Sequence, residues 1–107
     1  MLKVLTEQDS HGDHVGNIIK ANPLTILYFY ATWCVPCKSL EDPMKEYSEL
    51  YPEIMILKID VGTCPNIAKE YNVKSVPAFL FIKQGEIVAS NSGSISSLAD
   101  VIKDFVN

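Results

Sequence analysis

The sequence predicts one α/β domain, in which a central mixed sheet of five strands is flanked by four helices. Three observations predict this class. The 107 residues fall within the size range of one domain, so we expect residues 1–107 to form a single domain. The composition, 48% hydrophobic and 21% charged, is that of a globular protein. Strand-like and helix-like stretches alternate through the first part of the chain, which is typical of parallel strands joined by helical crossovers.

The five expected strands are short apolar stretches. Residues 24–31 and 54–61 are almost continuously apolar, as strands buried on both faces of a sheet are. The last two strands are separated by Gln84 and Gly85, a dipeptide typical of a tight turn, which predicts an antiparallel hairpin. The remaining expected strands are residues 2–5, 78–83 and 86–90.

The four expected helices have apolar side chains that recur three or four residues apart. The second contains Pro43, which we expect to kink it because proline has no N–H donor. The third follows Thr63, a candidate cap residue, and has Pro65 early in its first turn. The four apolar faces are Val15, Ile18 and Ile19; Leu40, Met44, Tyr47, Leu50 and Tyr51; Ile67, Ala68 and Tyr71; and Leu98, Val101, Ile102 and Phe105.

The charge balance disfavours several kinds of partner. Thirteen acidic residues outnumber nine basic ones, all of them lysines, and the net charge is -4. Because clustered Lys and Arg bind phosphate backbones, we expect no nucleic-acid partner. No apolar stretch approaches the ~20 residues of a membrane-spanning helix, and residues 1–7 lack the pattern of a secretion signal. We therefore expect a cytoplasmic protein without membrane association.

The cysteines are the strongest indication of function. Cys34 and Cys37 are three residues apart, between a predicted buried strand and a predicted helix. In a reducing compartment, such a pair is usually a metal site or a redox site. Unpaired N–H groups and the helix dipole favour a thiolate at a helix start. The arrangement therefore predicts that Cys34 attacks a substrate disulfide and that Cys37 resolves the mixed disulfide.

Zinc is the less favoured interpretation of this pair, and we expect no metal. A zinc site needs four ligands, and the other candidates, Cys64, His11 and His14, are not paired at ligand spacing. Cys64 itself has two interpretations. It is either a small half-buried residue at a helix start or a regulatory thiol that is oxidised or links two chains.

Residues 31–38, Ala-Thr-Trp-Cys-Val-Pro-Cys-Lys, resemble the active-site segment of thioredoxins, Trp-Cys-Gly-Pro-Cys-Lys. The resemblance extends from residue 2 to residue 106 and implies the thioredoxin fold. Cys64 falls where some animal members of the family carry an extra cysteine. Three further segments match the cis-proline, the hairpin turn and the substrate-groove glycine of that family: Val76-Pro77, residues 83–86 and Ser92-Gly93.

The resemblance implies a thioredoxin-type reductase of protein disulfides, with roles in electron transport and cell redox homeostasis. The redox-active disulfide would be Cys34–Cys37, and no cofactor would be bound. Electrons would come from NADPH through a separate flavoprotein thioredoxin reductase. We expect a monomer, with a Cys64-linked dimer as the alternative. The implied substrate-binding residues are Trp33, Val35, Pro36, Val76, Pro77 and Gly93.

The chain departs from the thioredoxin pattern near the cysteines. Tyr28 stands where the family has a buried aspartate that is thought to help deprotonate the resolving cysteine, and we expect Ile56 in place of its lysine partner. A phenol, with a pKa of ~10, is a poor base, so we expect Cys37 to attack more slowly or to use water or a neighbouring group. Val35 replaces a glycine and adds β-branched bulk, which is expected to affect the redox potential or the choice of partner.

Two other functions stay open at this point. The first is a redox-slow binding module that recognises proteins through a groove of Trp33, Val76 and Gly93, which the loss of the buried acid would favour. The second is an oxidase or isomerase, which would need an oxidising compartment.

Overall fold

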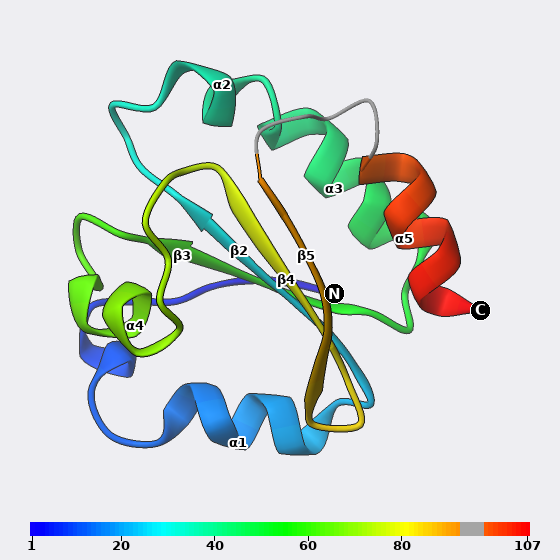
Figure 1. Ribbon diagram of the computed structural model, residues 1–107, viewed down its shortest axis with the longest axis horizontal. Helices are drawn as coiled ribbons and strands as arrows, with labels where there is room; N and C mark the ends of the chain where they lie inside the picture. Colours follow the sequence, from blue (N-terminus) through cyan, green and yellow to red (C-terminus); the bar gives the residue numbers. More distant parts are fainter. Residues whose placement is uncertain (93–97) are drawn as a thin grey trace.

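The computed structural model describes residues 1–92 and 98–107, which form a mixed five-stranded sheet with helices on both faces (Figure 1). The order of the strands across the sheet is β1-β3-β2-β4-β5. The first three strands in this order are parallel, whereas β4 is antiparallel to both of its neighbours. The strands are β1 (Leu2–Val4), β2 (Leu24–Tyr30), β3 (Met55–Asp60), β4 (Ala78–Lys83) and β5 (Glu86–Ser92). The predicted α/β fold is therefore confirmed.

Two layers of helices cover the sheet, and Figure 1 shows them on opposite sides of it. Helices α1 and α4 pack against Leu27 and Phe29 of the central strand β2, whereas α3 and α5 pack against Ile26 and Tyr28. This alternation follows from the period of two along a strand. None of the described helices is long and apolar enough to cross a membrane. The helices are η1 (Gln8–Ser10), α1 (His14–Ala21), α2 (Val35–Lys38), α3 (Glu41–Leu50), α4 (Pro65–Glu70) and α5 (Leu98–Val106).

The second expected helix is divided into α2 and α3, and counting them as one interrupted helix gives the four that were expected. Pro43 has no N–H to donate to the carbonyl of Ser39, one turn earlier. At this point the Leu40 N–H donates to the Cys37 carbonyl, three residues back, at 3.0 Å. The regular pattern resumes where the Met44 N–H donates to the Leu40 carbonyl at 2.9 Å. The interruption therefore precedes the proline and leaves α2 as a short separate turn.

Strands β1, β2 and β3 are one or two residues shorter than predicted, and the start of α4 and the end of β5 also differ. Cys64, and not Thr63, is the residue that precedes α4, because its carbonyl accepts the first helical hydrogen bond, from the Ile67 N–H at 3.2 Å. Strand β5 continues two residues past the predicted end at Ser90, because the β4 register continues through Ser92.

The hairpin between β4 and β5 is confirmed. Gln84 and Gly85 have φ angles of 53° and 82°. Two successive positive values are the geometry of a two-residue turn whose twist matches that of the flanking strands.

Candidate active site

The cysteine pair lies just beyond the C-terminal end of β2, the central strand. Cys34 has an extended backbone and precedes α2, and its Sγ accepts a hydrogen bond from the Cys37 N–H at 3.3 Å. Pro36 occupies the first turn of α2, where its missing N–H costs no hydrogen bond. The sequence Cys-Val-Pro-Cys thus folds into one turn that brings its two ends together.

Cys34 and Cys37 form a disulfide, with their Cα atoms 5.3 Å apart. Only 4% of Cys34 and 3% of Cys37 is exposed to solvent, whereas Trp33 and Val35 are each 72% exposed. The bulk of Val35 therefore lies at the surface beside the pair. An apolar surface flanks a nearly covered disulfide, so a partner that reaches the sulfur atoms also contacts these side chains.

The segment before β4 approaches the cysteines from the other side. The peptide bond between Val76 and Pro77 is cis, as the resemblance implied. Val76 packs against the cluster formed by Ala31 and the two cysteines. Trp33 and Val76 line one cavity of about 180 Å³. The structure thus brings two of the expected groove residues together, while Gly93 lies outside the described residues.

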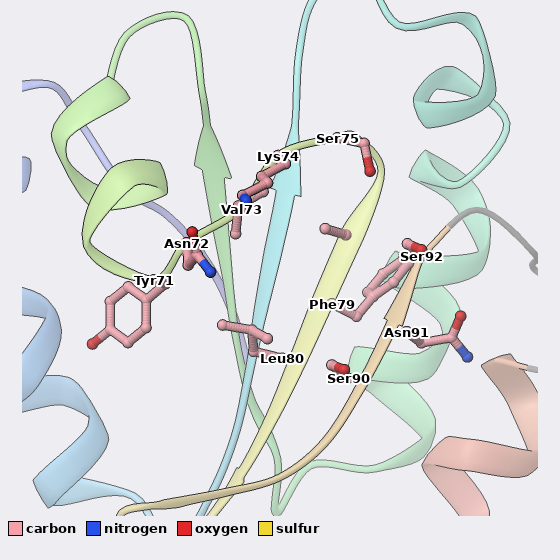
Figure 2. A pocket seen from close by; sticks show the side chains of 11 residues that line it. Tyr71, Asn72, Val73, Lys74, Ser75, Phe79, Leu80, Ser90, Asn91 and Ser92 are labelled. Atoms are coloured by element: carbon pink, nitrogen blue, oxygen red, sulfur yellow. The ribbon is translucent and has the colours of Figure 1, made fainter.

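A cavity of about 660 Å³ adjoins this segment (Figure 2). It lies between residues 71–75 and the neighbouring parts of β4 and β5, and its rim includes the polar side chains of Asn72, Ser75 and Ser90. Neither member of the disulfide lines it. The cavity is therefore an extension of the surface beside Val76 and not the place where sulfur chemistry occurs.

Tyr28 lies beneath the cysteine turn and is 1% exposed. Its hydroxyl donates to the Cys37 carbonyl at 3.3 Å, and its ring stacks on those of Phe79 and Tyr30, with centroids 4.9 Å and 5.7 Å away. Burial, followed by the negative charge of Glu41 and the effect of Tyr30, raises the pKa of Tyr28 to about 12. Near neutral pH the phenol is thus even less ionised than an exposed tyrosine, so no phenolate is present to accept a proton, and its hydroxyl supports the turn through a hydrogen bond.

A third cavity, of about 160 Å³, reaches Cys37 from the side of Tyr28. We call it the Cys37 cavity, and its lining residues are Tyr28, Tyr30, Ala31, Thr32, Cys37, Lys38, Glu41 and Lys58. The sequence analysis identified neither Glu41 nor Lys58 as part of the site. Glu41 follows Cys37 by four residues, the spacing of neighbours along a helix, and this spacing is a signal that could have indicated it.

A family model of thioredoxin matches residues 3–106. The chain belongs to the thioredoxin family. It is 38% identical over 107 residues to thioredoxin of Callithrix jacchus, covering 99% of this chain and 100% of that protein. It is 37% identical over 89 residues to mitochondrial thioredoxin-3 of Saccharomyces cerevisiae, covering 82% and 70% of the two chains. Thioredoxin-2 of Pyricularia oryzae is 36% identical over 84 residues, but the match spans 75% of this chain and only 49% of that protein.

Solved structures agree with this assignment. The crystal structure of reduced Schistosoma mansoni thioredoxin pre-protein superposes with a TM-score of 0.85 at 36% identity, covering 97% of each chain. A thioredoxin with a disulfide-bonded Cys34–Cys37 pair is a thiol–disulfide oxidoreductase of the protein-disulfide reductase type. This finding does not favour the alternative of a redox-slow binding module.

A lysine lies near Tyr28, although Ile56 was expected in the place of the lysine that partners the family's aspartate. In the pairing of β2 with β3, Tyr28 lies beside Lys58, whereas Ile56 lies beside Ile26. The Lys58 Nζ is 4.8 Å from the centre of the Tyr30 ring, a cation–π distance. A cation therefore does lie next to the position where the family has its aspartate.

Cys64 is a free thiol and is completely buried. Its Sγ lies 3.7 Å from the Thr6 carbonyl oxygen and 3.6 Å from the Thr63 Oγ1. These surroundings favour the packing interpretation, because a thiol that links two chains has to reach the surface. Among the described residues, no group of three or more His, Cys, Asp or Glu side chains is placed to hold a metal ion.

Proposed function

We propose that the chain reduces disulfides of other proteins, with Cys34 as the nucleophile and Cys37 as the resolving thiol. The Cys34 thiolate attacks one sulfur of the substrate disulfide, and the first substrate thiolate leaves. Cys37 then attacks the Cys34 Sγ, which forms the intramolecular disulfide and releases the second substrate thiolate. The observation that carries this proposal is the Cys34–Cys37 disulfide itself, which is the expected end state of that sequence.

We infer that the substrate-binding surface consists of Trp33, Val35, Pro36, Val76, Pro77 and Gly93. Trp33 and Val35 are exposed and apolar beside the disulfide, and Val76 shares a cavity with Trp33. An extended substrate segment would add main-chain hydrogen bonds to the backbone of Val76. Because apolar contacts and main-chain hydrogen bonds distinguish few side chains, such a surface suits many protein disulfides.

Trp33→Ala is expected to lower kcat/KM for a protein disulfide about tenfold or more, because a large exposed aromatic side chain that a partner covers contributes on the order of 2 kcal/mol. The rate with a small disulfide, which covers little of Trp33, is expected to stay unchanged. Steady-state reduction of insulin and of oxidised glutathione would measure the two rates. Leu50→Ala, which removes an exposed apolar side chain at the end of α3, serves as the control. Equal losses of kcat/KM with both substrates would contradict the proposal that Trp33 contributes to the binding of protein substrates.

We further propose that the chain acts as a single domain over residues 1–107 and as a monomer in the cytoplasm. It would bind no cofactor and would receive electrons from NADPH through a separate flavoprotein thioredoxin reductase. Membership of the thioredoxin family supports the reductase, and the buried free thiol of Cys64 is consistent with a reducing compartment. Fractionation of cells that make the protein would separate a cytoplasmic location from a mitochondrial one, which the name mitochondrial thioredoxin-3 indicates for the yeast relative.

A further inference from the structure

The second half of the reaction requires a proton acceptor that Tyr28 does not supply. Cys37 is 3% exposed, and its thiol has to lose a proton when it attacks the Cys34 Sγ. The Tyr28 hydroxyl donates to the Cys37 carbonyl, so its proton is directed at the backbone and not at the sulfur. Another group has to receive the Cys37 proton when the mixed disulfide is resolved.

We propose that the Glu41 carboxylate accepts the proton of the Cys37 thiol, through water in the Cys37 cavity, and so replaces the buried acid of other thioredoxins. The inference rests on the resolving role proposed for Cys37. Glu41 is the first residue of α3 and lines the same cavity as Cys37. The two residues are four apart in the sequence, on either side of the interruption that Pro43 imposes.

The cavity suits a water-mediated transfer. Its volume of about 160 Å³ holds several water molecules, each of which occupies roughly 30 Å³. Polar side chains of Thr32, Lys38 and Lys58 line it together with Glu41, which gives such water hydrogen-bonding partners. Water can therefore connect the carboxylate to the thiol without direct contact between them.

The charge of Glu41 acts on the interior of this cavity. It is among the causes that raise the pKa of both Tyr28 and Tyr30. Within the described part of the chain, no hydrogen bond or ion pair engages the Glu41 carboxylate, so it is available to a proton. Its neighbours in the cavity include the ammonium groups of Lys38 and Lys58.

Two other carboxylates in this region are less suitable. Asp60 raises the pKa of Tyr30 but does not line the cavity, and its Oδ1 accepts a hydrogen bond from the Gly62 N–H at 2.8 Å. Asp42 follows Glu41 in the first turn of α3 and does not line the cavity either. Glu41 is the acidic side chain that the Cys37 cavity contains.

The proposed step is balanced. The proton of the Cys37 Sγ passes through water to Glu41 as the Cys37 Sγ forms a bond with the Cys34 Sγ. The bond between the Cys34 Sγ and the substrate sulfur breaks, and the substrate sulfur leaves with the electron pair and takes up a proton from water. The substrate disulfide is thereby reduced by two electrons, and the dithiol of the chain is oxidised by two.

The test is a single-turnover experiment with the reduced chain and excess insulin, quenched with acid and analysed by mass spectrometry between about pH 6 and 9. The mixed disulfide on Cys34 forms in the first step and decays in the second. In Glu41→Gln, we expect formation of the mixed disulfide at the parent rate and its decay slowed about 100-fold at neutral pH, the lower end of general-base effects. The difference in decay rate between Glu41→Gln and the parent is expected to shrink as the pH rises, because hydroxide then removes the proton of the Cys37 thiol.

Two matched variants complete the experiment. Glu41→Asp is expected to restore part of the decay rate, and Asp42→Asn, which removes a charge from the same turn of α3, is expected to decay like the parent. The proposal would be overturned if the mixed disulfide of Glu41→Gln decayed at the parent rate across the pH range. It would also be overturned if the formation and the decay of the mixed disulfide were slowed equally. A Cys37→Ser chain, in which the second step is blocked, that forms no mixed disulfide on Cys34 would overturn both this inference and the proposed role of Cys34.

Discussion

Replacing Cys34 with serine is expected to reduce the turnover of protein disulfides to the rate of dithiothreitol alone. A serine hydroxyl is not deprotonated near neutral pH and does not attack a disulfide, whereas the thiolate does. Cys37 does not compensate, because it lies within α2, one turn beyond the helix start at Cys34 where a thiolate is favoured. Replacing Cys37 with serine is expected to leave the first step intact and to trap the chain on its substrate as a mixed disulfide.

Turnover of insulin with dithiothreitol and mass spectrometry of the trapped species would measure both results. Cys64→Ser serves as the control, because this thiol lies outside the disulfide and is expected to be dispensable for turnover. A Cys34→Ser chain as active as the parent would show that the pair does not carry the reaction. A Cys37→Ser chain without a trapped adduct would contradict the assignment of the two roles.

The second large effect is on stability, and it concerns Tyr28. Tyr28→Ala is expected to lower the free energy of unfolding by about 3–5 kcal/mol, the usual range for removing a large aromatic side chain from a core. The ring is 1% exposed and stacks on Phe79 and Tyr30, so its removal leaves a cavity between the sheet and α3. Urea unfolding of the oxidised chain at neutral pH would measure the loss.

Tyr28→Phe separates the ring from its hydroxyl. It removes only the hydrogen bond to the Cys37 carbonyl, and we expect a loss of about 1 kcal/mol. Because the pKa of Tyr28 is raised to about 12, the phenol stays protonated throughout such a measurement and adds no pH dependence to it. Similar losses for the two variants would mean that the packed ring contributes little.

The sequence predicts the fold because its strongest patterns are local. The continuous apolar stretch at 24–31 has a simple physical origin, since a central strand is buried on both faces and needs apolar side chains on each. The turn at Gln84 and Gly85 is equally local, because two positive φ values favour such residues. The cysteine pair follows in the same way, since its spacing matches one turn of helix.

The features that sequence analysis missed depend on contacts between distant segments. The position of Lys58 beside Tyr28 is set by the register of β2 against β3, which no local pattern fixes. The complete burial of Cys64 depends on Thr6, which is 58 positions away in the chain. The Cys37 cavity likewise combines residues of β2, α2, α3 and β3, so the role of Glu41 emerged only from the structure.

The central claim is that Cys34 and Cys37 exchange two electrons as a dithiol and a disulfide. The most direct test is an equilibrium redox titration followed by the fluorescence of Trp33, the one tryptophan of the sequence and the neighbour of Cys34. The account predicts a single two-electron transition at or below the cytosolic glutathione poise, roughly -220 to -320 mV, and the same transition in Cys64→Ser. A titration that shows no transition, in a chain whose Cys34 and Cys37 thiols are shown to be free by labelling, would contradict this two-electron exchange.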